Sequence, residues 1–147
     1  MVDPVRVARL LRSLTDDLAF LEAESIASPE RRRDPMWLRG VKYSFVTAIE
    51  AAVDVAQHVC AAQGWGPPET NADALSLLGR HGVLADDLAA SMSRASGFRN
   101  VLVHDYVRVD DDLVAAKLAD LQDLRAFARE VANWLQNGST ALSTDPE

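Results

Sequence analysis

Apolar side chains recur every three or four positions along most of the chain, which is the spacing of amphipathic α-helices and not of β-strands. The first such stripe follows Asp3 and Pro4, an N-cap residue and a proline at the first helical position. We expect this helix to end between Ser25 and Pro29. Its apolar members are Val7, Leu10, Leu11, Leu14, Leu18 and Leu21.

A second stripe begins after Asp34 and Pro35, which repeat the cap-then-proline start. The segment 64–68, Gly-Trp-Gly-Pro-Pro, must end this helix near Gln63. The apolar positions of this helix are Trp37, Val41, Phe45, Ala48, Ala52, Val55 and Val59.

Three further helices are predicted beyond that loop: a short one over 70–82, one from Asp86 to about Gly97, and a last one after the acidic run 110–112. Carboxylates in that run suit a helix N-terminus, where the dipole favours negative charge. No β alternation is present, so we predict an all-α, up-and-down bundle of about five helices over residues 1–136. The segment 137–147 is polar and is expected to be a frayed tail.

Composition narrows the class of protein. The 147 residues suit one domain. The single cysteine, Cys60, excludes an intrachain disulfide and a cysteine-based zinc cluster. No stretch approaches the roughly eighteen apolar residues of a membrane span, and the N-terminus lacks signal-peptide features. We therefore expect a cytoplasmic protein with no membrane attachment.

The segment 97–106 concentrates Arg99, Asn100, His104 and Tyr106 in an otherwise apolar stretch. Histidine can give or take a proton near neutral pH, and arginine binds phosphate oxygens through a planar fork. Together they suffice to cleave an RNA phosphodiester without a metal ion, because the ribose 2′-OH supplies the nucleophile. We expect no cofactor and no metal.

Helical geometry places these side chains on different faces. At about 100° per residue, Arg99 and Tyr106 share a face, and Asn100 and His104 form an i,i+4 pair. Arg99 and His104 stand about 140° apart on the same helix. Either the helix begins irregularly after Gly97, or two copies of the motif face each other across a homodimer. We favour the homodimer, with a composite cleft.

The string 98–106, Phe-Arg-Asn-Val-Leu-Val-His-Asp-Tyr, resembles the R-x4-6-H signature of the HEPN superfamily, and the final tyrosine resembles its HepT branch. Residues 48–56 resemble the second-helix motif of that family. The Gly-Pro-Pro turn, the Leu77-Leu78-Gly79 helix and the 82–84 linker also follow its order, so the resemblance spans nearly the whole chain.

This resemblance implies a HEPN-like all-α homodimer that acts as a metal-independent endoribonuclease toxin on tRNA or mRNA, with Arg99 and His104 catalytic. It also implies a type VII system, in which a minimal nucleotidyltransferase (MNT) antitoxin silences the toxin by AMPylation of Tyr106. Glu50 and Asp54 match acidic positions of the family, where they would orient Arg99. The alternative is a non-catalytic HEPN subunit that binds nucleotide or assists a nucleotidyltransferase.

Other side chains have two interpretations each. Glu50, Asp54 and His58 recur at i, i+4 and i+8, which could make a metal site or a polar wall of the cleft. We expect a solvent-exposed face for His58. The basic run 31–33 could contact RNA or an acidic partner, and we expect a solvated loop there. Trp65 could stack a base or anchor a partner.

Net charge refines the expected partner. The chain carries a formal charge of -7, which argues against broad coating of nucleic acid. Residues 1–50 contain 8 basic and 8 acidic side chains, and residues 51–147 contain 7 and 14. Within that acidic part, the segment from Arg94 to Arg108 carries three arginines and His104 against Asp105 alone. The charge therefore allows RNA binding at one local site.

Overall fold

The computed structural model describes residues 1–104 and 111–143, with side chains up to Gly138. All regular structure in these residues is helical and none is strand, so the predicted all-α class is confirmed. The helices are α1 (Pro4–Glu24), α2 (Pro29–Arg32), α3 (Pro35–Gln63), α4 (Asn71–Arg80), α5 (Asp86–His104), α6 (Asp111–Leu118) and α7 (Gln122–Ser143).

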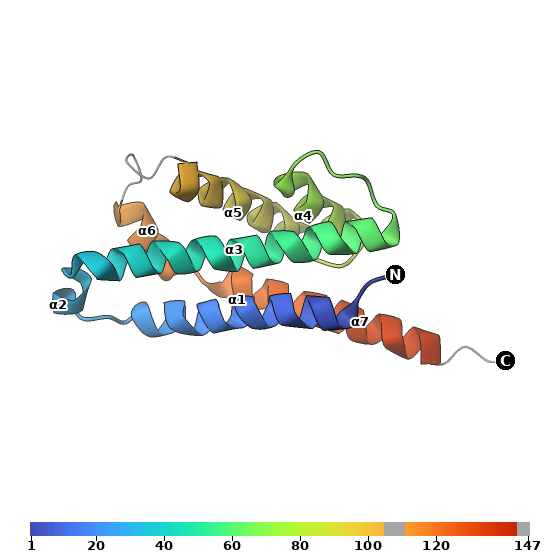
Figure 1. Cartoon of the computed structure of the whole chain (residues 1–147), viewed down its shortest axis with the longest axis horizontal. Coiled ribbons are helices and arrows are strands. Elements are labelled where there is room, and N and C mark those ends of the chain that lie inside the picture. The colour runs from blue at the N-terminus through green and yellow to red at the C-terminus, as the bar shows by residue number, and fades with distance from the viewer. Residues whose placement is uncertain (105–110, 144–147) are drawn as a thin grey trace.

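The long helix α3 runs through the middle of the molecule (Figure 1). Helices α1 and α7 lie on one side of it, and α4 and α5 lie on the other. By length and composition α3 could cross a membrane, contrary to the expectation from its sequence, but 56% of its apolar window is buried inside the protein. A core helix passes the same test, and burial on both sides explains why α3 is apolar around most of its circumference.

Polar side chains cap three of the helices, as predicted for α1 and α3. Asp3 accepts hydrogen bonds from the backbone N–H groups of the first turn of α1, Asp34 does so for α3, and Thr70 accepts from the N–H of Asp73 in α4. Gly64 ends α3 with a φ of 71°, in the left-handed region that favours glycine. The local signals in the sequence were therefore sufficient to start α1, α3 and α4.

The count of about five helices was too low, because the described residues contain seven. Ser28 caps the short helix α2, which stands where a loop was expected. The last predicted helix is two helices, separated by a turn at residues 119–121. Leu118 lies before this turn and Leu121 lies at its end, and both side chains are buried. The change in chain direction at the turn lets both leucines reach the core. Helix α7 continues to Ser143, and the domain boundary after residue 136 stays a prediction.

Helix α5 also differs from its prediction, since it passes through Gly97 and ends at His104. Glycine lowers helix stability by about 1 kcal/mol relative to alanine, but packing can offset this cost. Ser96 and Leu102 are buried on either side of Gly97 and hold this part of α5 against the core. The whole described part of the Arg–His motif is therefore helical.

The basic run 31–33 lies at the corner between α1 and α3. Arg31 donates from Nε and Nη2 to the buried carboxylate of Glu24, and Trp37 donates from Nε1 to the same carboxylate at 2.7 Å. Arg32 donates to two backbone carbonyl oxygens after α1, and its guanidinium lies 5.1 Å from the Trp37 ring centroid. Two of the three arginines in the run thus hold the fold together.

Helices α4 and α5 pack unusually closely. A Cβ placed on Gly79 of α4 would lie 2.6 Å from the Cβ of Ala89 on α5. No side chain larger than hydrogen fits there without a shift of one helix. At the other end of α4, Ser93 of α5 donates to the backbone oxygen of Ala72 at 3.2 Å, next to Asn71.

Candidate functional site

Arg99 on α5 points toward α3, where it pairs with Glu50. Its Nε lies 3.2 Å and its Nη2 2.5 Å from Oε1 of Glu50, and its Nη1 donates to Oδ1 of Asn100 at 3.1 Å. Three nitrogens of the guanidinium are therefore held at once. The Arg99 side chain is 22% exposed and that of Glu50 is 43% exposed, so the pair can be reached from solvent.

Asp54 lies one turn beyond Glu50 on α3. Among the described residues its carboxylate makes no hydrogen bond or ion pair. Partial desolvation raises the pKa of Asp54 above its usual value, and the negative charge of Glu50 raises it further. The positive charges of Arg6 and Arg99 act in the opposite direction with less effect. A proton is held on Asp54 to higher pH than on an ordinary aspartate.

An open hollow of about 360 Å³ lies over these side chains. Two amide side chains close its far end, where Nε2 of Gln57 donates to Oδ1 of Asn71 at 3.3 Å. Neither amide was predicted as a site residue from the sequence. Gln57 could have been found from its position seven residues after Glu50 on the same helical face, but nothing local connects Asn71 to it. The lining residues are Glu50, Val53, Asp54, Gln57, Asn71 and Arg99.

His58 takes no part in this hollow. Its Nε2 accepts a hydrogen bond from the backbone N–H of Asp3 at 3.0 Å, which ties the start of α1 to α3. Within the described ranges no three histidine, cysteine or carboxylate side chains are grouped as metal ligands. The metal interpretation of Glu50, Asp54 and His58 therefore finds no support in the geometry.

His104 is the last residue of α5 and is exposed. Because α5 is helical from Asp86 onward, the motif does not begin irregularly after Gly97. Arg99 and His104 remain about 140° apart on one regular helix. A single chain does not aim both side chains at one atom. Tyr106, the expected modification site, lies outside the described residues.

The aromatic side chain in the Gly/Pro loop has a structural role. The Trp65 ring stacks on His81 with centroids 4.0 Å apart and planes within 3°, and it lies 6.1 Å from the ring of Trp134. Trp65 is half-buried by these contacts. One face of its indole is therefore occupied by His81, which favours packing within the protein over stacking on a base.

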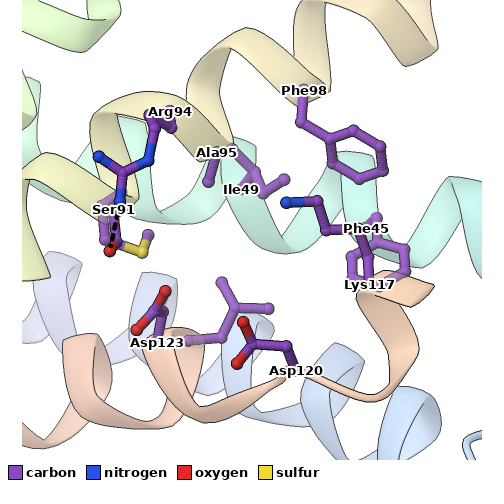
Figure 2. A pocket seen from close by; sticks show the side chains of 11 residues that line it. Phe45, Ile49, Ser91, Arg94, Ala95, Phe98, Lys117, Asp120 and Asp123 are labelled. Atoms are coloured by element: carbon purple, nitrogen blue, oxygen red, sulfur yellow. Dashed lines mark hydrogen bonds between the residues drawn. The ribbon is translucent and has the colours of Figure 1, made fainter. Parts of the chain in front are cut away.

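A second hollow, of about 180 Å³, lies on the other side of α5 and is shown in Figure 2. Phe45 and Phe98 form an edge-to-face pair in its wall, and Lys117 lies 5.6 Å from the Phe98 ring centroid. Arg94 and Lys117 are balanced there by the carboxylates of Asp120 and Asp123. This hollow contains none of Arg99, Glu50 and His104, so we place the candidate site on the other face of α5.

Comparison with protein families identifies the chain. The model of the HepT-like ribonuclease family matches residues 7–131. The chain belongs to this family. The match covers every described helix except the start of α1 and the end of α7, and it includes both sides of the hollow around Arg99.

Individual HepT-like relatives are named nucleases. A protein of Archaeoglobus fulgidus, provisionally named an RNase, is 33% identical over 96 residues, which cover 65% of this chain and 72% of that protein. An mRNA nuclease HepT of Shewanella oneidensis is 32% identical over 79 residues, covering 53% and 59%. A tRNA nuclease HepT of Aphanizomenon flos-aquae is 31% identical over 87 residues, covering 58% and 59%. These matches span only part of each relative.

A solved structure of a HEPN toxin has a similar fold. A tri-AMPylated Shewanella oneidensis HEPN toxin in complex with MNT antitoxin superposes with a TM-score of 0.81 at 21% identity, covering 90% of this chain and 99% of that one. At that level of identity the likeness establishes the HEPN fold.

Proposed function

We propose that this chain is a metal-independent endoribonuclease toxin whose catalytic residues are Arg99 and His104. The observation that carries the proposal is the ion pair between Arg99 and Glu50 in an open hollow. Arg99 lies on α5, the helix that ends in the exposed His104. Glu50 and Asn100 hold the guanidinium in place, which preorganises it for a phosphate. Membership of a ribonuclease family supports the same reaction.

In the proposed reaction the ribose 2′-OH attacks the adjacent phosphorus as its proton is removed. The P–O5′ bond breaks, and the 5′-oxygen leaves with a proton. The products are a 2′,3′-cyclic phosphate and a 5′-hydroxyl. His104 moves a proton to or from one of these oxygens, and Arg99 stabilises the extra negative charge on the phosphoryl oxygens.

The active form in this proposal is a homodimer. Arg99 and His104 diverge on one helix, so a cleft between two copies of α5 brings the arginine of one protomer near the histidine of its partner. Apolar side chains at the same end of the molecule are exposed and would be covered by such contact: Met36, Tyr43, Val101, Val103 and Leu113. Dimer formation would also double the local positive charge of the motif.

The proposed regulator is an MNT nucleotidyltransferase antitoxin that transfers AMP from ATP to Tyr106. The α-phosphorus of ATP would bond to the tyrosine oxygen, with release of pyrophosphate. Tyr106 lies two residues after His104 in the sequence. Phosphates attached there would enter the region in which the substrate phosphate binds. We place both proteins in the cytoplasm.

The first test is cleavage of RNA by the purified full chain, with and without EDTA. We expect cleavage that EDTA does not reduce, and a loss of about 10²–10⁴-fold in His104→Ala. His81→Ala is the matched control, since His81 stacks on Trp65 away from the hollow. Cleavage that is unchanged in His104→Ala, or absent in the wild type, would contradict the proposal and favour a non-catalytic nucleotide-binding subunit.

The second test is the intact mass of the protein after coexpression with the nucleotidyltransferase encoded beside it. The expected increment is a whole number of AMP units that is lost in Tyr106→Phe. The chain has only two tyrosines, and the other, Tyr43, has 70% of its surface exposed. Tyr43→Phe is therefore a demanding control, because it removes an accessible competitor and must leave the increment unchanged.

A further inference from the structure

The charge in the hollow around Arg99 does not suit a second phosphate. Two carboxylates, Glu50 and Asp54, line it with a single cation. Arg6 acts on Asp54 but lies outside the lining. Once Arg99 has taken the scissile phosphate, the remaining wall is rich in hydrogen-bond acceptors. A neutral group with donors fits this wall better than another anion does.

The open hydrogen-bonding groups form a defined pattern. Both carboxylate oxygens of Asp54 are open among the described residues, and a carboxylate can accept two parallel N–H groups. Asn71 accepts from Gln57 through Oδ1, and among the described residues its Nδ2 amide has no acceptor, so it can donate. Asp54 and Asn71 together offer two acceptors beside one donor, and Oε2 of Glu50 and Oε1 of Gln57 are further acceptors in the lining.

Among the RNA bases, guanine matches this pattern with one edge. Its N1–H and N2–H₂ groups can donate together to one carboxylate, and its O6 next to them can accept from an amide. Uracil offers a single donor between two acceptors on that edge, so one carboxylate oxygen would have no donor. Adenine and cytosine each present an acceptor where the carboxylate requires a donor.

We infer that the hollow formed by Asp54, Gln57 and Asn71 is a guanine-binding subsite beside the scissile phosphate held by Arg99. The inference rests on the proposed ribonuclease function for the RNA context, and on the hollow alone for the base. The Asp54 carboxylate accepts hydrogen bonds from N1–H and N2–H of guanine, and the Asn71 amide donates a hydrogen bond to O6. Gln57 is a positioning residue, because its hydrogen bond to Oδ1 of Asn71 holds that oxygen away from the base.

The order of these residues along α3 matches the direction of a nucleotide. Glu50, Asp54 and Gln57 follow at i, i+4 and i+7 on one face. From Glu50 to Gln57 the helix rises about 10 Å. Arg99 sits at the first of these positions and Asn71 at the last. A phosphate at one end and its base at the other can therefore lie along the same helical face.

The test is binding of GMP, AMP, CMP and UMP to the full chain by isothermal titration calorimetry. The four share ribose and phosphate, so differences report on the base alone. We expect GMP to bind about tenfold tighter than UMP. Asp54→Asn and Asn71→Asp should reduce that ratio to about twofold or less. Both changes preserve size, and an aspartate is favourable in the first turn of α4.

Asp73→Asn is the matched control. Asp73 lies in the same first turn of α4 but does not line the hollow, so the GMP preference should be unchanged. Equal binding of the four nucleotides, no binding of any, or an equal loss of preference in Asp73→Asn would each overturn the subsite. Melting temperatures of the variants that are no lower than that of the wild type exclude general damage as the cause.

Cleavage of RNA separates the two proposals. Oligonucleotides of uridine with one guanosine, or one adenosine in its place, should be cut about tenfold faster beside guanosine, and Asp54→Asn should cut both at similar rates. If the wild type cuts RNA with no base preference, the subsite is wrong and the ribonuclease stands. If GMP binds selectively but no RNA is cut, the ribonuclease is wrong and the base site stands as a nucleotide site.

Discussion

Three arginine–glutamate pairs join helices within the described residues, and two of them, Arg31–Glu24 and Arg99–Glu50, differ in which partner is enclosed. At the α1–α3 corner the Glu24 side chain is 9% exposed and Arg31 is 58% exposed. At the hollow the order is reversed, because the Arg99 side chain is 22% exposed and Glu50 is 43% exposed. At the corner the carboxylate is the more buried partner, whereas at the hollow the guanidinium is the more buried partner and the carboxylate is the more exposed one.

The hydrogen bonds explain what each pair does. Glu24 accepts from Arg31 and from the buried indole of Trp37, so both of its oxygens are used within the fold. In the hollow, the carboxylate of Asp54 has no such partner among the described residues. The same residue types thus serve structure where every group is paired, and suit a ligand where some remain open.

The largest expected effect comes from removing the Arg99 side chain, and removing the Arg31 side chain is its counterpart at the corner. Arg99→Ala should lower the rate of RNA cleavage by about 10²–10³-fold, the usual loss when one donor to a transition-state oxyanion is removed. Arg31→Ala should leave the rate unchanged and lower the thermal stability instead. Single-turnover cleavage and thermal unfolding, measured on both variants, test the pair.

Arg99→Lys sharpens this prediction. Lysine keeps the positive charge but lacks the planar fork that reaches Glu50, Asn100 and a phosphate together. We expect it to restore only a small part of the lost rate. A full recovery would mean that charge alone matters at this position, and the geometric part of the comparison would be wrong.

The next effect is on stability at the corner. Glu24→Gln removes the charge that Arg31 and Trp37 share, and it should lower the free energy of unfolding by about 1–2 kcal/mol. For a chain of this size that corresponds to a fall of about 3–6 °C in melting temperature. Glu30→Gln, an exposed carboxylate on α2, is the control and should change little. RNA cleavage should be unaffected by either substitution.

The two carboxylates should also respond to pH in opposite ways. Hydrogen bonds from Arg31 lower the pKa of Glu24 below its usual 4.5, so its contribution is present above pH 4.5 and is lost as the pH falls through the lowered value. The pKa of Asp54 is raised above 3.8, so the folded protein is less stable once the pH exceeds that raised value.

Asp54→Asn should accordingly stabilise the protein at pH 7, by up to about 0.5 kcal/mol as for other surface changes. The gain should disappear below pH 3.8, where Asp54 is protonated in both the folded and unfolded states. Urea unfolding of the wild type and variant across this range measures it. A variant that is less stable at pH 7 would show that Asp54 supports the fold and is not held open for a ligand.

The sequence predicted much of the fold and part of the site. Caps such as Asp3 and Asp34 act within a few residues, so local patterns located the starts of α1 and α3. The turn at 119–121 depends on which leucines reach the core, and local spacing does not show that. Arg99 was found from the cluster of arginine, asparagine, histidine and tyrosine at 97–106, and the role of Glu50 beside it came from the resemblance. The amide of Asn71 reaches Gln57 only because α4 packs against α3 and α5, which is a tertiary event.

The smallest expected effect concerns Arg33, the third member of the basic run. Arg31 and Arg32 are held by the corner, but the Arg33 side chain is exposed and forms no hydrogen bond or ion pair with other described residues. Arg33→Ala should change the free energy of unfolding by less than about 0.5 kcal/mol.

The same variant tests whether the run binds RNA. A lysine or arginine that contacts a phosphate contributes about one unit to the slope of log affinity against log salt. We expect the slope for RNA binding to be the same in Arg33→Ala and the wild type, because the guanidinium groups of Arg31 and Arg32 already donate to Glu24 and to backbone carbonyl oxygens. A slope reduced by about one would instead make the corner part of the RNA interface, and the contrast between the two arginine–glutamate pairs would no longer separate structure from function.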